Sequence, residues 1–279
     1  MKLIKSSRTQ AKIKLALQGP SGSGKTYSAL LLAYGLCKDW SKIAVIDTEN
    51  NSSHLYAHLG EYYVLNVSAP YTPERYIEAI KICEEAGSQV IIIDSLSHEW
   101  DGEGGLLEYH SQLVGNSFTN WSKLTPRHAT LVQKILTSNC HVIATVRSKQ
   151  EYVLSEKNGK QVPEKIGMKA IQRDGLEYDF TIVFEIDIHH NATCTKDRTQ
   201  LFPPNNLFKI NCKTGEEIAD WCKNSFPLQA ELDTNKIYAC KTLEELCDLY
   251  NKEPILHQFR DDFTQQATFL KNEKISTFN

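Results

Sequence analysis

The chain has 279 residues, 41% hydrophobic and 23% charged, which suits a soluble protein with one large α/β domain and a small appendage. Its formal net charge of −3 argues against a protein that coats nucleic acid over its whole surface, although a local basic patch is compatible with it. No apolar run has membrane-spanning length and the N-terminus lacks a signal-peptide core, so we expect a cytoplasmic protein without membrane contacts.

The strongest signal is a glycine-rich motif near the N-terminus. A basic arm over residues 1–12 leads into a predicted strand over 12–18, then the pattern G-x-x-x-x-G-K-[ST], then a helix to about residue 38. A P-loop requires this order, because its glycines turn backbone N–H groups toward a phosphate at a helix N-terminus. Lys25 is predicted to reach the β- and γ-phosphates, and Thr26 to hold Mg²⁺. The predicted nucleotide-binding residues are Gly19, Pro20, Ser21, Gly22, Ser23, Gly24, Lys25, Thr26 and Tyr27.

Apolar strands and helices alternate after this motif. The pattern predicts strands over residues 42–47, 62–67, 89–94 and 140–146. Thr72-Pro73-Glu74 and Thr125-Pro126 read as helix starts, while 97–123 reads as a polar, glycine-rich loop. Because such alternation produces right-handed βαβ crossovers, we predict an α/β fold with a mainly parallel sheet flanked by helices.

The pattern changes after residue 147. Residues 147–175 are polar, with Asn158-Gly159 as a predicted hairpin turn, and the strand predicted over 180–186 is followed by an antiparallel return over 190–202. Capping boxes that begin at Thr214 and Thr242 predict further helices. We therefore predict an N-terminal arm over 1–12, an ATPase core over 13–228 and a small helical appendage over 229–279.

Two acidic residues end predicted strands, and either could serve the Mg²⁺ ion. Asp94 follows a longer and more apolar run than Asp47, so we favour Asp94 as the acid that binds Mg²⁺ together with Thr26. Hydrolysis also needs a group that orients or deprotonates water, and Ser95 stands where many P-loop ATPases carry Glu. Glu49 is the favoured base, with Glu99 and Glu103 as weaker candidates.

The combination of Asp47-Thr48-Glu49 after the second strand with Asp94-Ser95 after a later one resembles the RecA superfamily. That resemblance implies that Glu49 is the catalytic base and Asp94 the Walker B acid. More closely, the chain resembles phage-encoded RecA-like ATPases, often labelled phage nucleotide-binding proteins, a group that includes single-strand-annealing recombinases. The similar stretches are residues 19–32, 46–50, 91–100, 143–152 and 196–202.

The resemblance also extends to Lys196-Asp197-Arg198, which is similar to the K-x-R pair of RecA-like helicases and RadA-type proteins. In those families both cations act on the neighbouring subunit's γ-phosphate. The resemblance thus implies catalytic roles for Lys196 and Arg198, and a homo-oligomer, either a ring or a filament. Without it, the pair reads as two solvated charges on a strand.

RecA-type proteins bind single-stranded DNA through two loops, which correspond here to residues 97–123 and 147–175. A basic loop can track a phosphate backbone, while Phe118, Trp121 and Tyr152 could stack on bases. RecA-like proteins carry a polar sensor near the end of this strand, which links the γ-phosphate to the DNA loop, and several of them use Gln there. Arg147 is a departure from that pattern. The residues predicted to contact DNA are Arg147, Lys149, Lys157, Lys160, Lys165, Lys169 and Arg173.

The sequence alone leaves three functions open. The favoured one is an oligomeric ATPase that acts on single-stranded DNA in phage recombination, annealing or replication, inside the bacterial host cytoplasm. The alternatives are a nucleotide switch, such as a helicase loader or assembly chaperone with weak hydrolysis, and a small-molecule kinase. A kinase usually carries an Arg-rich lid, whereas 147–175 is rich in Lys; a GTPase is disfavoured because no N-K-x-D motif occurs.

Overall fold

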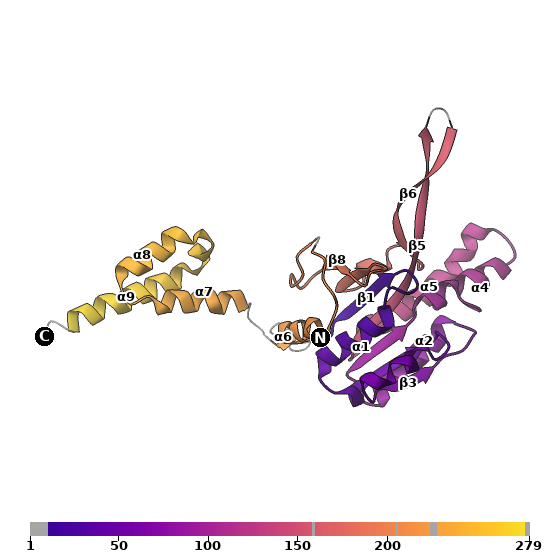
Figure 1. The fold of residues 1–279 in the computed structure, drawn as a ribbon, viewed down its shortest axis with the longest axis horizontal. Coiled ribbons are helices and arrows are strands. Elements are labelled where there is room, and N and C mark those ends of the chain that lie inside the picture. Colours follow the sequence, from indigo (N-terminus) through magenta and orange to yellow (C-terminus); the bar gives the residue numbers. More distant parts are fainter. Residues whose placement is uncertain (1–10, 158–159, 205, 224–227, 277–279) are drawn as a thin grey trace. The chain divides into compact units, whose positions relative to one another are not determined.

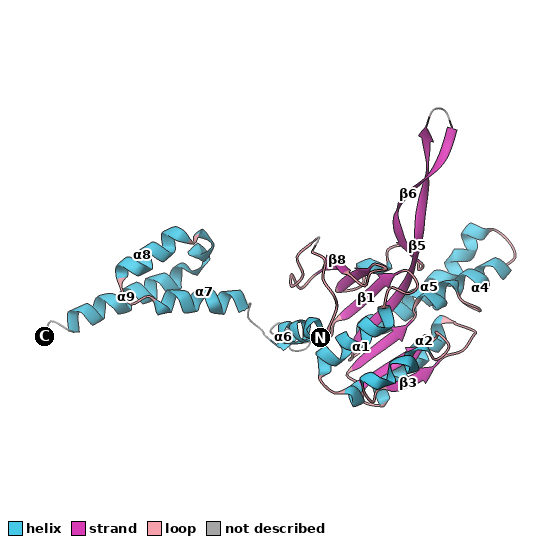
Figure 2. Ribbon diagram, in the orientation of Figure 1, coloured by secondary structure: helices cyan, strands magenta, loops and turns pink. Residues whose placement is uncertain are grey.

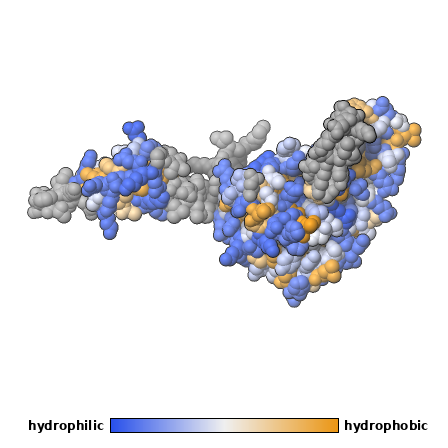
Figure 3. Space-filling model, turned by 45° about the horizontal axis from the view of Figure 1, so that its top comes forward, coloured by the Kyte–Doolittle hydropathy of each residue, from blue (hydrophilic) through white to orange (hydrophobic). Residues whose placement is uncertain are grey.

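The computed structural model describes residues 11–157, 160–204, 206–223 and 228–276, and side chains are not described over 150–167, 228–233, 254–255, 258 and 272–276. The chain divides into two compact units, one that ends at Cys222 and one that begins at Lys223. The predicted arm over 1–12 lies almost wholly outside the described residues. In the described part of the chain, no helix is long and apolar enough to cross a membrane. The face in Figure 3 is mostly hydrophilic, with scattered hydrophobic spots.

The first unit is built on an eight-stranded sheet (Figure 1). Its order is β3-β2-β4-β5-β1-β7-β8, with β6 paired to β5. Pairing is parallel from β3 through to β7, while β8 runs antiparallel to β7 and β6 antiparallel to β5. The strands are β1 (Lys14–Gly19), β2 (Ile43–Asp47), β3 (Tyr63–Asn66), β4 (Val90–Asp94), β5 (His141–Lys157), β6 (Lys160–Ala170), β7 (Ile182–Ile186) and β8 (Ala192–Asp197). The predicted mainly parallel α/β fold is confirmed.

Helices cover both faces of the sheet (Figure 2). On one face α1 (Lys25–Cys37) and α6 (Cys212–Lys223) bury a cluster that includes Leu15, Leu30 and Phe184. On the other, α2 (Pro73–Glu85) and α5 (Ser117–Thr137) bury Tyr76, Ile93 and Leu131. Each fully buried Leu or Ile side chain stabilises the fold by about 1.5–3 kcal/mol, so these clusters fix the strand ends in position. Single-turn 3-10 helices are η2 (Trp40–Lys42) and η4 (Leu176–Tyr178), and η3 spans Ser52–Leu59.

The segment expected to be a loop, 97–123, is helical instead, and that expectation was wrong. It forms α3 (Ser97–Asp101), α4 (Leu106–Gln112) and the first turns of α5. The N-terminus of α5 is capped by Asn116, whose side chain accepts hydrogen bonds from the N–H groups of Phe118 and Thr119. Pro126 therefore lies inside α5 rather than at its start. Packing against α2 keeps this helix intact at the proline, which cannot donate to the carbonyl four residues back.

Strand β5 leaves the parallel sheet and continues into a long hairpin with β6. Ser148 pairs with Ala170 at the base of the hairpin and Lys157 pairs with Lys160 at its far end. The predicted turn at 158–159 lies outside the described residues. A second correction concerns α6, which begins at Cys212 rather than at the Thr214 capping box. Asn211 accepts a hydrogen bond from the Lys213 N–H and so caps this start.

The second unit is a small helical assembly. It contains α7 (Leu228–Ala239), α8 (Leu243–Lys252), the 3-10 helix η5 (Pro254–Phe259) and α9 (Arg260–Ser276). Its own core is formed by Ile237, Leu246, Leu256, Phe263 and Leu270. The Thr242 side chain accepts a hydrogen bond from the Glu245 N–H, the geometry that its capping sequence predicts.

Candidate active site

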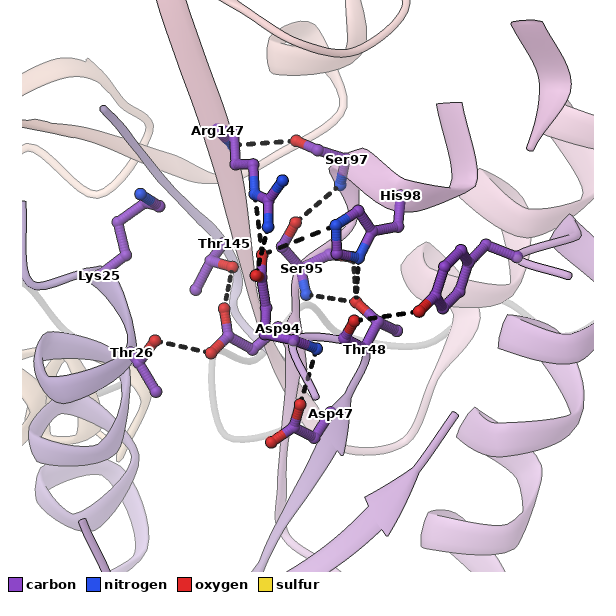
Figure 4. Close-up of polar contacts among 12 residues, drawn as sticks. Lys25, Thr26, Asp47, Thr48, Asp94, Ser95, Ser97, His98, Thr145 and Arg147 are labelled. Carbon is purple, nitrogen blue, oxygen red and sulfur yellow. Dashed lines mark hydrogen bonds and ion pairs between the residues drawn. The ribbon is translucent and has the colours of Figure 1, made fainter. Parts of the chain in front are cut away.

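A pocket of about 580 Å³ lies at the carboxyl ends of the central strands, where open α/β sheets place their ligands. The P-loop and the start of α1 form one wall, and the ends of β2 and β4 together with the middle of β5 supply acidic and basic side chains. Figure 4 shows Lys25 and Thr26 on the P-loop side, with Asp94 and Arg147 opposite them. The residues around it are Ser21, Gly22, Gly24, Lys25, Thr26, Tyr27, Ser28, Glu49, Ser52, Tyr56, Asp94, Arg147, His190, Lys209 and Ile210.

Backbone geometry shapes the P-loop for an anion. Gly22 and Gly24 adopt φ values of 80° and 86°, which residues with a Cβ rarely adopt. A Cβ on Gly19 would lie 2.5 Å from the Ile186 carbonyl oxygen, so this position is closed to larger residues. Lys25 Nζ donates to the carbonyl oxygens of Gly19 (2.9 Å) and Pro20 (2.8 Å). Burial lowers the pKa of Lys25, while the nearby carboxylates of Asp94 and Glu49 raise it.

Asp94 faces the P-loop, although β4 is not the neighbour of β1. Strand β5 lies between them, and the side chain of Asp94 spans that gap. Its two oxygens accept hydrogen bonds from the hydroxyls of Thr26 (2.7 Å) and Thr145 (2.5 Å), as Figure 4 shows. Asp94 is 2% exposed, and burial raises the pKa of its carboxyl group. The result is a buried carboxylate directly beside the hydroxyl of the P-loop threonine.

The rival acid, Asp47, has a different role. One of its oxygens accepts from the Glu49 N–H (2.7 Å), and the other accepts from the N–H (2.9 Å) and hydroxyl (2.5 Å) of Ser53. Both oxygens are thus occupied by the turn that follows β2. Asp47 fixes the backbone that carries Glu49, in the manner of a turn-stabilising aspartate.

Glu49 forms a two-pronged ion pair with Arg147 at the edge of the pocket. Arg147 Nε donates to Glu49 Oε1 at 2.9 Å, and its NH2 group donates to Oε2. The Glu49 side chain is 23% exposed and that of Arg147 is 41% exposed. Arg147 stands at the junction where β5 stops pairing with β1 and starts pairing with β6. The ion pair therefore joins the end of β2 to the base of the hairpin.

The pocket also contains residues that sequence reasoning missed. His190 Nδ1 lies 3.0 Å from the Ser23 carbonyl oxygen, so its ring lies against the P-loop. Tyr56 and Tyr27 approach each other with ring centroids 5.7 Å apart, and Lys209 completes the lining. His190 follows β7, which pairs in parallel with β1, so both strands end at the same edge of the sheet. Its position after a predicted strand could have indicated His190 from the sequence. Tyr56 and Lys209 carry no pattern in the sequence that points to the pocket.

The donor set at this site fits a magnesium ion. Thr26 and Asp94 offer a hydroxyl and a carboxylate 2.7 Å apart, and hard oxygen ligands of this kind suit Mg²⁺. Two protein oxygens suffice, because Mg²⁺ usually keeps several waters and phosphate oxygens. Within the described ranges, no group of three or more His, Cys, Asp and Glu side chains could hold a metal ion by itself.

The weaker base candidates lie away from this pocket. Glu99 is fully buried in the core, where His128 Nδ1 lies 3.1 Å from Oε1 and Gln172 donates to Oε2 at 3.2 Å. Glu103 is exposed on the turn between α3 and α4, and its carbonyl oxygen accepts from the Tyr71 N–H. Of the three acidic candidates, Glu49 is the one that the fold brings to the pocket.

Lys196, near the end of β8, and Arg198, directly after that strand, come together at the far edge of the sheet. Lys196 Nζ donates to the carbonyl oxygens of Glu177 (2.9 Å) and Tyr178 (2.5 Å), and Arg198 also donates to Tyr178 at 3.0 Å. Asp197 points away and accepts hydrogen bonds from the Thr199 and Phe202 N–H groups. Within one chain, neither cation is among the residues that line the P-loop pocket.

The predicted DNA contacts are divided among several environments. Lys149 is exposed near the base of the hairpin, while Lys169 pairs with Asp174 at 2.9 Å. These two lysines and Arg173 line a second hollow together with Trp100 and Trp121, whose rings stack 5.5 Å apart. Phe118 is 87% exposed on α5. The side chains of Tyr152, Lys157, Lys160 and Lys165 lie outside the described residues.

Comparison with known families agrees with this geometry. Residues 11–215 match a family model described as an AAA domain, which is more than half of the chain. The chain belongs to this AAA domain family. Its AAA domain contains the P-loop, Glu49, Asp94 and the β5–β6 hairpin, and it ends within α6. The protein therefore has an AAA-type P-loop ATPase domain. No curated protein matches the chain.

Proposed function

We propose that the AAA domain binds Mg²⁺ and ATP and hydrolyses ATP, with Glu49 as the general base. The observation that carries this proposal is the meeting of Thr26, Asp94 and Glu49 around one pocket, from three separate segments of the chain. Lys25 at the P-loop supplies the cation for the β- and γ-phosphates. Mg²⁺, held by Thr26 and Asp94, would neutralise charge on the phosphate oxygens.

The proposed reaction is in-line attack of water on the γ-phosphorus. Glu49 accepts a proton from the attacking water, whose oxygen forms the new bond to phosphorus. The bond from the γ-phosphorus to the bridging oxygen breaks, ADP leaves with that electron pair, and the proton on Glu49 passes to the released phosphate. Asp94, which is buried and hydrogen-bonded through both oxygens, holds its place throughout.

We further propose that a neighbouring subunit completes the site. Lys196 near the end of the edge strand β8 and Arg198 just after it both donate to the Tyr178 carbonyl oxygen, so a second copy of the chain can present both cations to the γ-phosphate of the first. Such cations would stabilise the charge that develops as the phosphate departs. This arrangement implies a homo-oligomer and poor hydrolysis by a single chain.

Single-stranded DNA is the proposed substrate of the assembly, in phage recombination, annealing or replication. Support comes from the RecA-like residue pattern and from the basic residues at the base of the hairpin, of which Lys149 is exposed. A second function is favoured by one observation: Glu49 is held through both oxygens by Arg147. A nucleotide switch with weak hydrolysis, such as a helicase loader or assembly chaperone, would suit a base held in this way.

ATP hydrolysis with and without single-stranded DNA separates these functions. The recombination proposal expects DNA to stimulate turnover and Lys149→Glu to weaken that stimulation, because a phosphate contact becomes a repulsion. Lys81→Glu, on the exposed side of α2, is the matched charge control. Lys25→Ala should abolish both nucleotide binding and turnover. Binding with negligible turnover at any DNA concentration would favour the nucleotide switch.

A further inference from the structure

Glu49 has a second neighbour, His98, whose ring is held on several sides. His98 lies in α3, four residues after Asp94, and its Nδ1 lies 2.8 Å from the Thr48 hydroxyl oxygen. The Tyr71 ring stacks on it with centroids 4.9 Å apart, and the Tyr71 hydroxyl donates to the Thr48 carbonyl oxygen. The side chain of His98 is 16% exposed. These contacts leave Nε2 as the ring nitrogen that faces Glu49.

The distance between His98 and Glu49 suits a charge-dependent contact. His98 Nε2 lies 4.0 Å from Glu49 Oε1, within ion-pair range and beyond hydrogen-bond length. Arg147 approaches the same carboxylate from β5, so Glu49 lies between a permanent cation and a group that can become one. Figure 4 shows the Arg147 and His98 side chains converging from β5 and α3.

Thr48 ties this histidine to the backbone that carries Asp94. Its hydroxyl oxygen accepts a hydrogen bond from the Ser95 N–H at 2.9 Å and lies 3.2 Å from the Ser95 carbonyl oxygen. Because Thr48 directly precedes Glu49 and Ser95 directly follows Asp94, one hydroxyl links the two acidic positions. His98 extends that link back to Glu49. The position of the His98 ring is therefore tied to the backbone segments that carry Glu49 and Asp94.

We propose that His98 is a positioning residue that fixes Glu49 over the pocket and makes ATP hydrolysis depend on its own charge. This inference rests on the proposed role of Glu49 as the base. When His98 is neutral, it limits where Oε1 can move once the carboxylate loosens from Arg147. When His98 is protonated, the imidazolium attracts Glu49, stabilises its anion and makes it a weaker base.

The charges around the ring set the direction of the pH effect. Burial lowers the pKa of His98; Glu49 and Asp101 raise it, and Arg147 lowers it. Burial has the largest effect, so the ring is neutral at neutral pH and gains its proton only in acid. We therefore expect kcat to fall as the pH drops through the pKa of His98, with no matching change in KM for ATP.

The test compares kcat, KM and the pH profile of His98→Ala and His98→Gln with those of the wild type. His98→Ala should lower kcat about ten- to hundredfold, as expected for a misplaced catalytic group, and leave KM within about twofold. His98→Gln keeps polar reach toward both neighbours, so it should recover part of kcat and lose the acid step assigned to the histidine. His58→Gln, at the exposed end of η3, is the control and should behave as wild type.

Wild-type kcat and an unchanged pH profile in both His98 variants would overturn the proposal. Circular dichroism and ATP affinity would show whether each variant is folded, and His98→Gln alone carries the test if His98→Ala is unstable. The Glu49→Gln variant distinguishes a failure of the proposed base from a failure of the proposed role of His98. If Glu49→Gln hydrolyses ATP normally, the proposed base is wrong; if it is inactive while both His98 variants are fully active, only the role of His98 is wrong.

Discussion

Asp47 and Asp94 end neighbouring strands with the same residue, yet their surroundings give them different properties. Asp47 accepts hydrogen bonds from two backbone N–H groups and one hydroxyl, so its charge is compensated by the turn it holds. Asp94 accepts from two hydroxyls, and burial raises the pKa of its carboxyl group. A buried carboxylate of this kind costs stability until a cation compensates it.

Asp94→Asn should therefore stabilise the protein in the absence of Mg²⁺. A carboxyl group whose pKa is raised in the folded state loses stability as the pH rises from its unfolded pKa to its folded pKa, and Asn removes that loss. Thermal unfolding in chelator at pH 8 should show a higher midpoint for the variant, with weaker protection by added Mg²⁺ and ATP. A lower midpoint in chelator would contradict this view of Asp94.

Asp47→Asn is the matched change at the neighbouring strand, and it should destabilise the protein. An amide cannot accept all three hydrogen bonds of the turn with the strength of a carboxylate, so we expect a loss of about 1–3 kcal/mol in unfolding free energy. Urea titration measures it. If Asp47→Asn were as stable as the wild type, Asp47 would not stabilise the turn as we expect.

At the scale of elements, α2 and α5 are joined by a two-pronged ion pair. Arg127 Nε and NH2 donate to the two oxygens of Glu74 at 2.7 and 2.8 Å. Hydrogen bonds from Arg127 lower the pKa of Glu74 from 4.5 to about 2. Since the Glu74 side chain is 56% exposed, solvent screens much of this attraction.

Glu74→Gln should cost about 0.5–1 kcal/mol at neutral pH, the upper range for an exposed pair. The pKa of Glu74 is depressed in the folded state, so its contribution is complete above pH 4.5 and is lost as the pH falls toward 2. Urea titrations between pH 7 and pH 3 should show the wild type and variant converging in acid. Glu78→Gln, exposed on the same helix, is the control; a gap that widens in acid would contradict the assignment.

The parallel core could be predicted from the sequence because its short apolar strands alternate with helices, and that alternation is typical of a parallel sheet. The prediction failed over 97–123, where Gly102, Gly104 and Gly105 suggested a loop and Pro126 suggested a helix start. The structure resolves this through tertiary contacts: α5 packs along α2, and Asn116 caps it nine residues before Thr125. Local helix propensity predicts that a helix starts or ends near a proline, and it cannot predict a helix that tertiary packing keeps intact across one.

The residues of the candidate site that belong to sequence motifs could be predicted. The residues that contact them through tertiary packing could not. The P-loop, Asp94 and Glu49 follow strand ends in fixed patterns, and the fold brings them to one pocket. Arg147 also follows a predicted strand, but no sequence pattern links either Arg147 or His98 to Glu49. They meet Glu49 because β5 lies beside β4 and because α3 places His98 against Thr48, the residue that follows β2. Strand order cannot be read from spacing alone.

The proposed active site requires more than one chain. Lys196 and Arg198 lie at the β8 edge, away from the pocket that they are proposed to serve. Arg198→Ala should therefore reduce turnover in an assembly and leave ATP binding intact. Mixing it with Glu49→Gln protein should restore activity, because some interfaces then combine an intact base with an intact arginine. Lack of recovery in stable mixed assemblies would contradict the shared site.

We propose above that this pocket hydrolyses ATP with Glu49 as the base. The most direct measurement loads wild-type and Glu49→Gln protein with radiolabelled ATP and Mg²⁺ and follows ADP formation in a single turnover. We expect Glu49→Gln to bind ATP with an affinity within about threefold of the wild type and to hydrolyse it about 10²- to 10⁴-fold more slowly, the contribution typical of a general base. Hydrolysis by Glu49→Gln at the wild-type rate would contradict it.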